Sequence, residues 1–160
     1  MKKLLVTFFY VLAITNLVQA QIKSIKLLDQ NIGQVHLIYQ KIIDLDKGDT
    51  LYMVYMGFQN ARYSTLTDIK SIALSTTEMM EEFKKDLSGA NKQMQSGEKV
   101  SMRWDRKEYQ IQLHEFTKEC SLGDGDGRGY TWLNLKQINK LINGLNRIQF
   151  GQDQLLVESK

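Results

Sequence analysis

The stretch VHLIYQKIIDLDKGDTLYMVYMGF, residues 35–58, decides the fold. Its first ten residues are rich in β-branched and aromatic side chains, residues 46–49 have the composition of a turn, and residues 50–58 run back in the same style. Two such runs around a glycine-containing turn predict a β-hairpin. The second run is apolar on both faces, which predicts a central strand that is covered on both sides.

The segments on either side of this hairpin extend the pattern. Residues 21–34 form a lead-in that predicts a short edge strand, and residues 68–74 predict a third strand. The tetrapeptide Ser75-Thr76-Thr77-Glu78 has the spacing of a capping box, and apolar residues follow at helical spacing. We therefore expect a helix from about residue 78, with Gly89 at its end.

The second half follows a similar plan. Alternating residues predict strands over 100–104 and 109–113, and a glycine-rich loop over 122–129 leads to a short strand and a helix with Asn134 as its cap. At an offset of 58 residues, core-type positions of the halves align, including Leu74 with Trp132 and Phe83 with Leu141. We predict an α+β domain with one antiparallel sheet of about six strands and two helices on one face. The offset indicates a duplicated hairpin-strand-helix unit, with coincidence as the alternative.

The N-terminus has the three zones of a secretory signal. Lys2 and Lys3 precede an uncharged apolar run over residues 4–14, and Val18 and Ala20 are the small residues before a cleavage site. This pattern predicts a cleavable signal peptide over 1–20, a single globular domain over 21–160, and a secreted or periplasmic location. A retained anchor is the alternative, but the run is short for a membrane span.

Cleavage changes what the charge implies. The chain has 21 basic and 18 acidic residues, and removal of Lys2 and Lys3 leaves 19 against 18. Long-range electrostatic attraction of an anionic partner depends on the net charge of the mature chain, which is close to zero. We therefore expect no nucleic-acid partner and no membrane insertion after cleavage. The basic cluster around Trp104 is interpreted as a hairpin tip kept soluble by charge.

The loop LGDGDGRG, residues 122–129, is the first choice for a functional region because mobile loops at sheet ends often bind ligands. Asp124 and Asp126 could give oxygen ligands to calcium, but the calcium-loop pattern fails at Arg128 and at Leu135. A solvated connection is the favoured interpretation, and no metal or cofactor is expected. The predicted ligand-binding residues are Asp124, Asp126, Arg128 and Tyr130.

Three further residues bear on catalysis or assembly. His36 and His114 are expected to face solvent from strands, because each is out of phase with an apolar set. A His114–Cys120 pair would need an orienting group, and no spacing in the sequence predicts one. Cys120 is the only cysteine. We expect it to be a buried apolar residue, with a disulfide-bridged dimer as the alternative.

Tyrosines and methionines are dense in the first hairpin. Tyr39, Tyr52 and Tyr55 predict an interaction surface, because such side chains are favoured at interfaces, although a core role is the common alternative. No catalytic or metal-binding spacing is present. We therefore expect a non-enzymatic exported binding protein whose partner is a protein, a glycan or an envelope component. The alternatives are a small hydrolase using the loop carboxylates with His114, and a calcium-dependent binding module.

Overall fold

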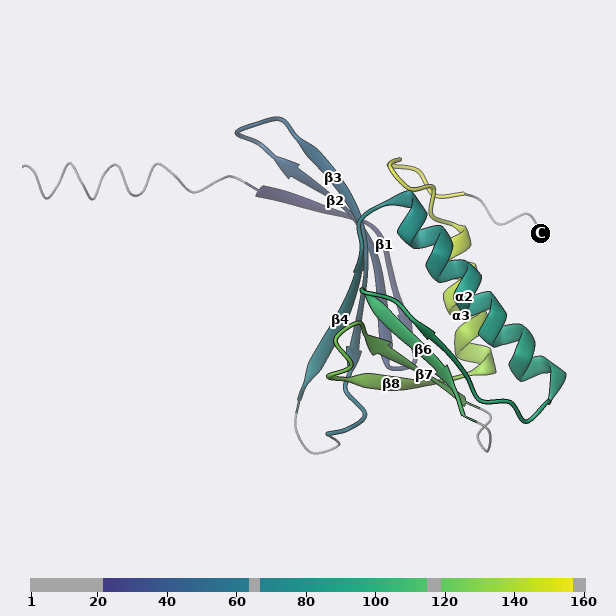
Figure 1. Cartoon of the computed structure of the whole chain (residues 1–160). Helices are drawn as coiled ribbons and strands as arrows, with labels where there is room; N and C mark the ends of the chain where they lie inside the picture. The colour runs from purple at the N-terminus through teal and green to yellow at the C-terminus, as the bar shows by residue number, and fades with distance from the viewer. Residues whose placement is uncertain (1–21, 64–66, 115–118, 157–160) are drawn as a thin grey trace, which may run out of the picture.

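The chain is described here by a computed structural model that covers residues 22–63, 67–114 and 119–156; the predicted signal peptide lies outside these residues. Each half is an antiparallel meander of four strands followed by a helix (Figure 1). The first half contains β1 (Ile22–Ile32), β2 (Val35–Asp44), β3 (Thr50–Gln59), β4 (Ile69–Leu74) and α2 (Thr77–Ser96). The second contains β5 (Met102–Asp105), β6 (Tyr109–Leu113), β7 (Glu119–Asp124), β8 (Tyr130–Asn134) and α3 (Leu135–Asn146).

The predicted α+β class with two helices is confirmed, but the single sheet of about six strands is wrong. The structure has two four-stranded sheets, β1-β2-β3-β4 and β5-β6-β7-β8. The expected short lead-in is a strand of eleven residues that pairs along the whole of β2. Residues 119–124 also form a strand, because Cys120 and Leu122 alternate into the core, so the glycine-rich turn is shorter than expected.

The order of elements repeats in the two halves, but the 58-residue offset aligns only part of each unit. It brings the helix caps Thr76 and Asn134 together, and it pairs the buried residues Phe83 and Leu141. In the strands, the offset aligns the residues of β3 with those of β6. The order of strands in each half instead makes β3, the third strand of the first sheet, equivalent to β7, the third strand of the second. The alignment of Leu74 with Trp132 is wrong in kind, because Leu74 is fully buried and Trp132 is only partly buried.

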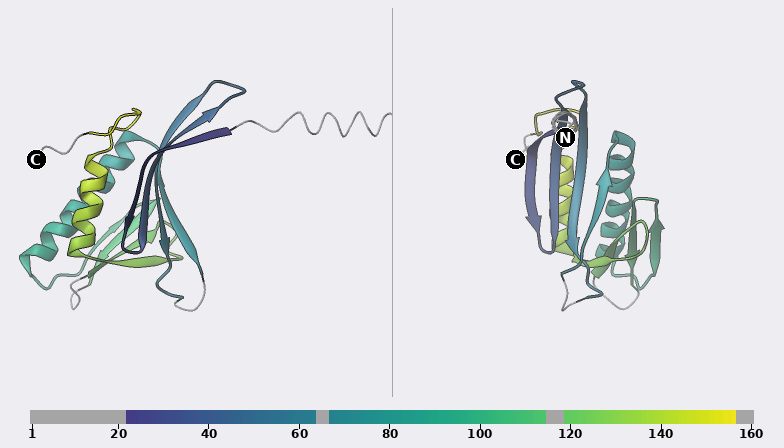
Figure 2. Two further views of the ribbon diagram at one scale, coloured as in Figure 1. Left: turned by 180° about the vertical axis from the view of Figure 1, so that it is seen from behind. Right: turned by 90° about the vertical axis from the view of Figure 1, so that its left-hand side faces the viewer.

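Both helices lie on the same side of the sheets and enclose a single core (Figure 2). Helix α2 contacts β4 and β6, whereas α3 contacts β1 and β8, so each helix touches both sheets. The side chain of Thr76, not Ser75, accepts from the Met79 amide and begins α2. Neither helix is long and apolar enough to span a membrane.

Helix α2 does not end at Gly89. It continues to Ser96 and ends at Gly97, which has a left-handed φ of 71°. Gly89 packs under the Trp104 indole, where an added Cβ would lie 3.3 Å from a ring carbon. A glycine within the helix therefore lets the Trp104 indole of β5 pack closely, at the usual cost of glycine in a helix.

Strand β3 is central in its sheet, as predicted, but it is covered on one face only. Val54, Met56 and Phe58 point inward and are buried. On the other face Leu51 is 45% exposed and Tyr55 is half-buried. The prediction of a strand covered on both sides is therefore wrong for the outer face.

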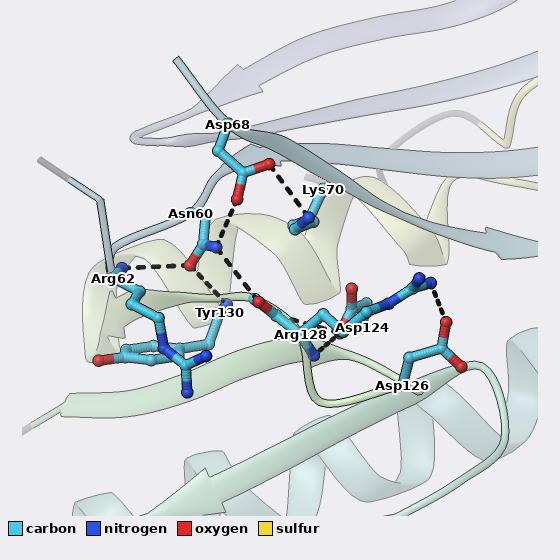
Figure 3. Close-up of polar contacts among 9 residues, drawn as sticks. Asn60, Arg62, Asp68, Lys70, Asp124, Asp126, Arg128 and Tyr130 are labelled. Atoms are coloured by element: carbon cyan, nitrogen blue, oxygen red, sulfur yellow. Dashed lines mark hydrogen bonds and ion pairs between the residues drawn. The ribbon is translucent and has the colours of Figure 1, made fainter. Parts of the chain in front are cut away.

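The two sheets meet at Asn60, which follows β3 and is fully buried (Figure 3). Its side-chain NH2 donates to Asp68 Oδ2 at 2.7 Å and to the carbonyl oxygen of Arg128 at 3.3 Å. Its Oδ1 accepts from the backbone amides of Arg62 at 3.1 Å and Tyr130 at 3.3 Å. These four bonds use both donors and both lone pairs of the amide. One buried side chain thus joins the end of β3 to the start of β8.

Backbone groups reinforce this seam. The Ala61 amide donates to the Tyr130 carbonyl oxygen at 2.6 Å. Gly129 lies so close to the other sheet that an added Cβ would be 2.4 Å from the Cγ of Lys70 and 2.9 Å from that of Asn60. Hydrogen bonds from Asn60 and then from Lys70 lower the pKa of Asp68, so this carboxyl remains an acceptor at neutral pH.

Replacement of Asn60 with alanine is expected to lower the free energy of unfolding by about 2–4 kcal/mol, because buried backbone groups on both sheets lose their partners. Urea denaturation followed by circular dichroism measures this effect. The matched control is Asn31→Ala, because Asn31 is exposed on β1 and its replacement should change stability by no more than about 0.5 kcal/mol. Equal stability of the two variants would contradict the role assigned to Asn60.

Candidate functional site

The glycine-rich loop is a structured hairpin turn between β7 and β8. Asp124 is buried, and its Oδ1 accepts from the amides of Arg128 at 2.8 Å and Gly129 at 3.3 Å. Its backbone pairs with Gly129 and Gly127, which closes the turn. Gly127 has a φ of 66°, a conformation that glycine adopts without steric cost. The carboxylate of Asp124 therefore stabilises its own loop.

Of the other predicted loop residues, Asp126 and Arg128 point toward each other, and Tyr130 lies away from them (Figure 3). Asp126 and Arg128 are exposed and form an ion pair with each other. Tyr130 lies on the outer face of the second sheet. Among the described residues, no group of three or more acidic, histidine or cysteine side chains could hold a metal ion. The carboxylates of Asp124 and Asp126 line one hollow, but each has a different partner: backbone amides for Asp124 and the Arg128 guanidinium for Asp126.

The three tyrosines predicted as an interaction surface lie in three different environments. Tyr39 is fully buried; its hydroxyl donates to backbone oxygens of Gln149 and Gln152 and accepts from the Gly151 amide. Tyr52 packs beside it and donates to Asp153 Oδ1 at 2.8 Å. These two residues therefore hold the C-terminal segment against the first hairpin. Only Tyr55 faces outward, beside Ile38 on the neighbouring strand.

His114 and Cys120 lie on opposite faces of the second sheet. Cys120 is fully buried in the core, and burial raises the pKa of its thiol to about 12. His114 points to the outer face, where its Nε2 lies 3.4 Å from Ser121 Oγ. The loop carboxylates line a separate hollow with Lys70 and Lys107. The residues proposed for a hydrolase therefore do not converge, and a disulfide between copies would require Cys120 to leave the core.

The outer face of the second sheet contains a groove that the register of its strands explains. Along the middle of the central strand β7 the outward residues are small, Ser121 and Gly123, whereas the exposed Glu119 lies on the same face at the start of the strand. Ser121 pairs with Trp132 on one side and Gln112 on the other, and Gly123 pairs with Tyr130 and Gln110. Large side chains on β8 and β6 thus flank a low floor. The groove has a volume of about 220 Å³.

Three neighbouring rings form a row along and across this groove: Tyr130 and Trp132 come from β8, whereas His114 follows β6 on the other side of β7. The centroids of Tyr130 and Trp132 are 5.5 Å apart with an interplanar angle of 84°, and those of His114 and Trp132 are 4.9 Å apart at 58°. The spacing of two residues along β8 places Tyr130 and Trp132 on the same face. Trp132 is therefore the middle ring of the row and is held from both sides.

The wall opposite β8 is made of amides. Gln110 and Gln112 alternate with the buried residues of β6, so both face the groove. Gln110 also lies near the turn, with its Nε2 3.5 Å from the Gly125 carbonyl oxygen. None of the described residues that line the groove is acidic, lysine or arginine. Beyond the amides, Arg103 and Asp105 on β5 neutralise each other in an ion pair of 2.7 Å.

Tyr130, predicted as a ligand-binding residue, and His114, predicted to face outward, both line the groove, which was not itself predicted. Trp132 was treated as a core position, and the two glutamines of β6 were not considered. Their alternation with Tyr109, Ile111 and Leu113 was a usable signal that they share a face. The register that brings these residues opposite β8 depends on β7, which the sequence analysis did not predict.

Comparison with known proteins gives no match to this chain among protein-family models, curated proteins or solved structures.

Calcium is expected to leave the melting temperature unchanged at millimolar concentration, because the Asp124 carboxylate is held by backbone amides. In contrast, Asp124→Ala should cost about 1–3 kcal/mol through the loss of two hydrogen bonds in a buried turn. Asp124→Asn keeps the acceptor oxygen and should lose less than half as much. A clear rise of the melting temperature with calcium would show that the loop binds the ion, since a ligand of the folded state must stabilise it.

Cys120 should be unreactive in the folded protein. The raised pKa keeps its thiol protonated at pH 8, whereas attack on a disulfide reagent needs the thiolate. We expect no colour with Ellman's reagent in native buffer and one equivalent in 6 M guanidinium chloride, where the thiol is exposed and its pKa returns toward the ordinary value. Rapid reaction of the native protein would place Cys120 at the surface.

Proposed function

We propose that this chain is a non-enzymatic binding protein that acts outside the cytoplasm and holds a neutral glycan in the groove along β7. The observation that carries this proposal is the pairing of an aromatic wall, Tyr130 and Trp132 of β8 with the His114 ring beside them, with an amide wall, Gln110 and Gln112 of β6. The lysine pair and apolar run at the N-terminus support export.

The aromatic wall suits the C–H face of a sugar ring. A pyranose has hydroxyl groups around its edge and a face of C–H bonds, which carry partial positive charge and pack on the negative face of an aromatic ring. Trp132 provides the largest such surface and is partly exposed. Because the flanking rings fix its position, little side-chain freedom is lost when a ligand binds.

The amide wall suits the hydroxyl edge. A glutamine side chain offers two N–H donors and a carbonyl acceptor, so it can satisfy a hydroxyl group that both donates and accepts. The Ser121 hydroxyl in the floor can do the same. The absence of charged side chains among the described lining residues favours a neutral ligand over a phosphate, a carboxylate or a basic peptide.

The arrangement favours binding over hydrolysis. Hydrolysis of a glycosidic bond commonly needs two carboxyl groups on either side of the bond. The groove presents no carboxyl group among its described lining residues, and the loop carboxylates Asp124 and Asp126 line a different hollow.

Titration with maltotriose, cellotriose and N-acetylchitotriose tests this proposal. The chain has two tryptophans, so Trp104→Phe leaves Trp132 as the only indole and makes its fluorescence a reporter of the groove. We expect a saturable change with at least one trisaccharide. In calorimetry, Trp132→Ala should weaken its binding by about tenfold or more, because a loss of 1.4 kcal/mol is a factor of ten.

Tyr55→Ala is the matched control, since Tyr55 is a half-buried aromatic residue on the outer face of the other sheet. It should leave the affinity unchanged. Gly123→Ala removes no polar group, yet it adds a methyl group to the groove floor, 3.0 Å from the backbone oxygen of Gly129, and should weaken binding in protein that calorimetry shows to be folded. If no trisaccharide binds at 10 mM, or if Tyr55→Ala and Trp132→Ala lose affinity equally, the proposal is wrong.

A further inference from the structure

Trp132 lines a second, larger hollow as well as the groove. This hollow has a volume of about 570 Å³ and lies at the seam between the sheets, where β3 ends and α3 begins. The groove and the seam hollow therefore share the indole as a common wall. Trp132 is thus the residue at which the two hollows adjoin.

The lining of the seam hollow shares the amides of the groove lining and adds one carboxylate, Glu119. It also includes one exposed ring, Tyr63, which is 43% exposed. The amides come from three places in the chain: Gln34 in the turn between β1 and β2, Gln59 and Asn60 at the end of β3, and Asn134 and Gln137 at the start of α3. Donors, acceptors and an aromatic ring thus recur in the seam hollow.

Several of these amides are held in place. The Thr131 hydroxyl donates to Gln34 Oε1 at 3.0 Å, which fixes the carbonyl end of that amide. Gln137 Oε1 accepts from the Asn134 backbone amide at 2.9 Å as part of a capping box. Gln137 also packs on Gly33, where an added Cβ would lie 1.9 Å from its Nε2. Fixed polar groups of this kind lower the entropy cost of binding a ligand.

The size of the hollows indicates the length of the ligand. Pockets for small ligands usually have volumes of about 300–1,000 Å³. The groove alone, at about 220 Å³, is below that range, and the seam hollow alone lies within it. A ligand that used only the groove would leave the lining of the seam hollow empty.

We infer that the ligand is a linear oligosaccharide that crosses Trp132, with one part in the groove along β7 and the next units in the seam hollow. This inference rests on the proposed function and adds to it that the protein recognises a chain rather than a single sugar. Tyr63 is the ring that receives the units beyond Trp132, and Gln34 provides a fixed amide beside them.

Affinity as a function of chain length tests this inference. Oligomers of two to six units from whichever series binds best (malto-, cello- or N-acetylchito-oligosaccharides) are titrated by calorimetry and by Trp132 fluorescence. We expect binding to strengthen at least tenfold between two and four units and then to level off. Tyr63→Ala should remove most of this gain and leave the affinity for the disaccharide unchanged.

The variants separate a failure of this inference from a failure of the proposed function. Gly123→Ala should weaken short and long oligomers alike, because it alters the groove, whereas Tyr55→Ala should affect neither. If two units bind as tightly as four, or if Tyr63→Ala has no effect on four units, the extended ligand is wrong while the groove remains a glycan site. If no oligomer of any length binds, both proposals are wrong.

Discussion

The buried amide of Asn60 is the interaction on which the arrangement of the two sheets depends. Each sheet is a meander whose strands pair with one another, and the chain after β3 and the turn before β8 bring further backbone groups that need partners to the seam. Asn60 meets this need from one position. Its side-chain NH2 donates to two oxygens, and its side-chain carbonyl oxygen accepts from two backbone amides. A buried amide that makes all four of its possible hydrogen bonds favours one arrangement of the sheets, because any other arrangement would leave several buried polar groups without partners.

The seam also sets where the candidate site lies. Arg128, whose backbone oxygen accepts from Asn60, belongs to the turn before β8. Tyr130, whose backbone amide donates to Asn60, is the first residue of β8. Fixing this turn positions Tyr130 and Trp132 beside the low floor of β7. The groove is thus a consequence of two local facts: a strand with serine and glycine on its outer face, and a neighbour held firmly with aromatic residues on the same face.

The local parts of the fold could be predicted and the long-range parts could not. The limits of β2 and the course of the first hairpin followed from strand-forming residues around Gly48. Helix α3 followed from its Asn134 cap and apolar stripe. The extent of β7 was missed because Gly123 and Asp124 read as loop residues, yet pairing with β6 makes them a strand. Gly89 read as a helix end because its partner, Trp104, is distant in sequence. The candidate site could not be predicted either, because it depends on the pairing of β7 with β6 and β8.

The position of Cys120 has a consequence for how the chain reaches its native state. A protein whose only thiol lies within the core forms no covalent link on folding, so its maturation needs neither an oxidant nor an isomerase. The stability of this fold must come from packing, from the hydrogen bonds at the seam, and from those that join Tyr39 to the C-terminal segment. It is therefore indifferent to the redox potential of the compartment around it, and the same folded state should form in a reducing or an oxidising milieu.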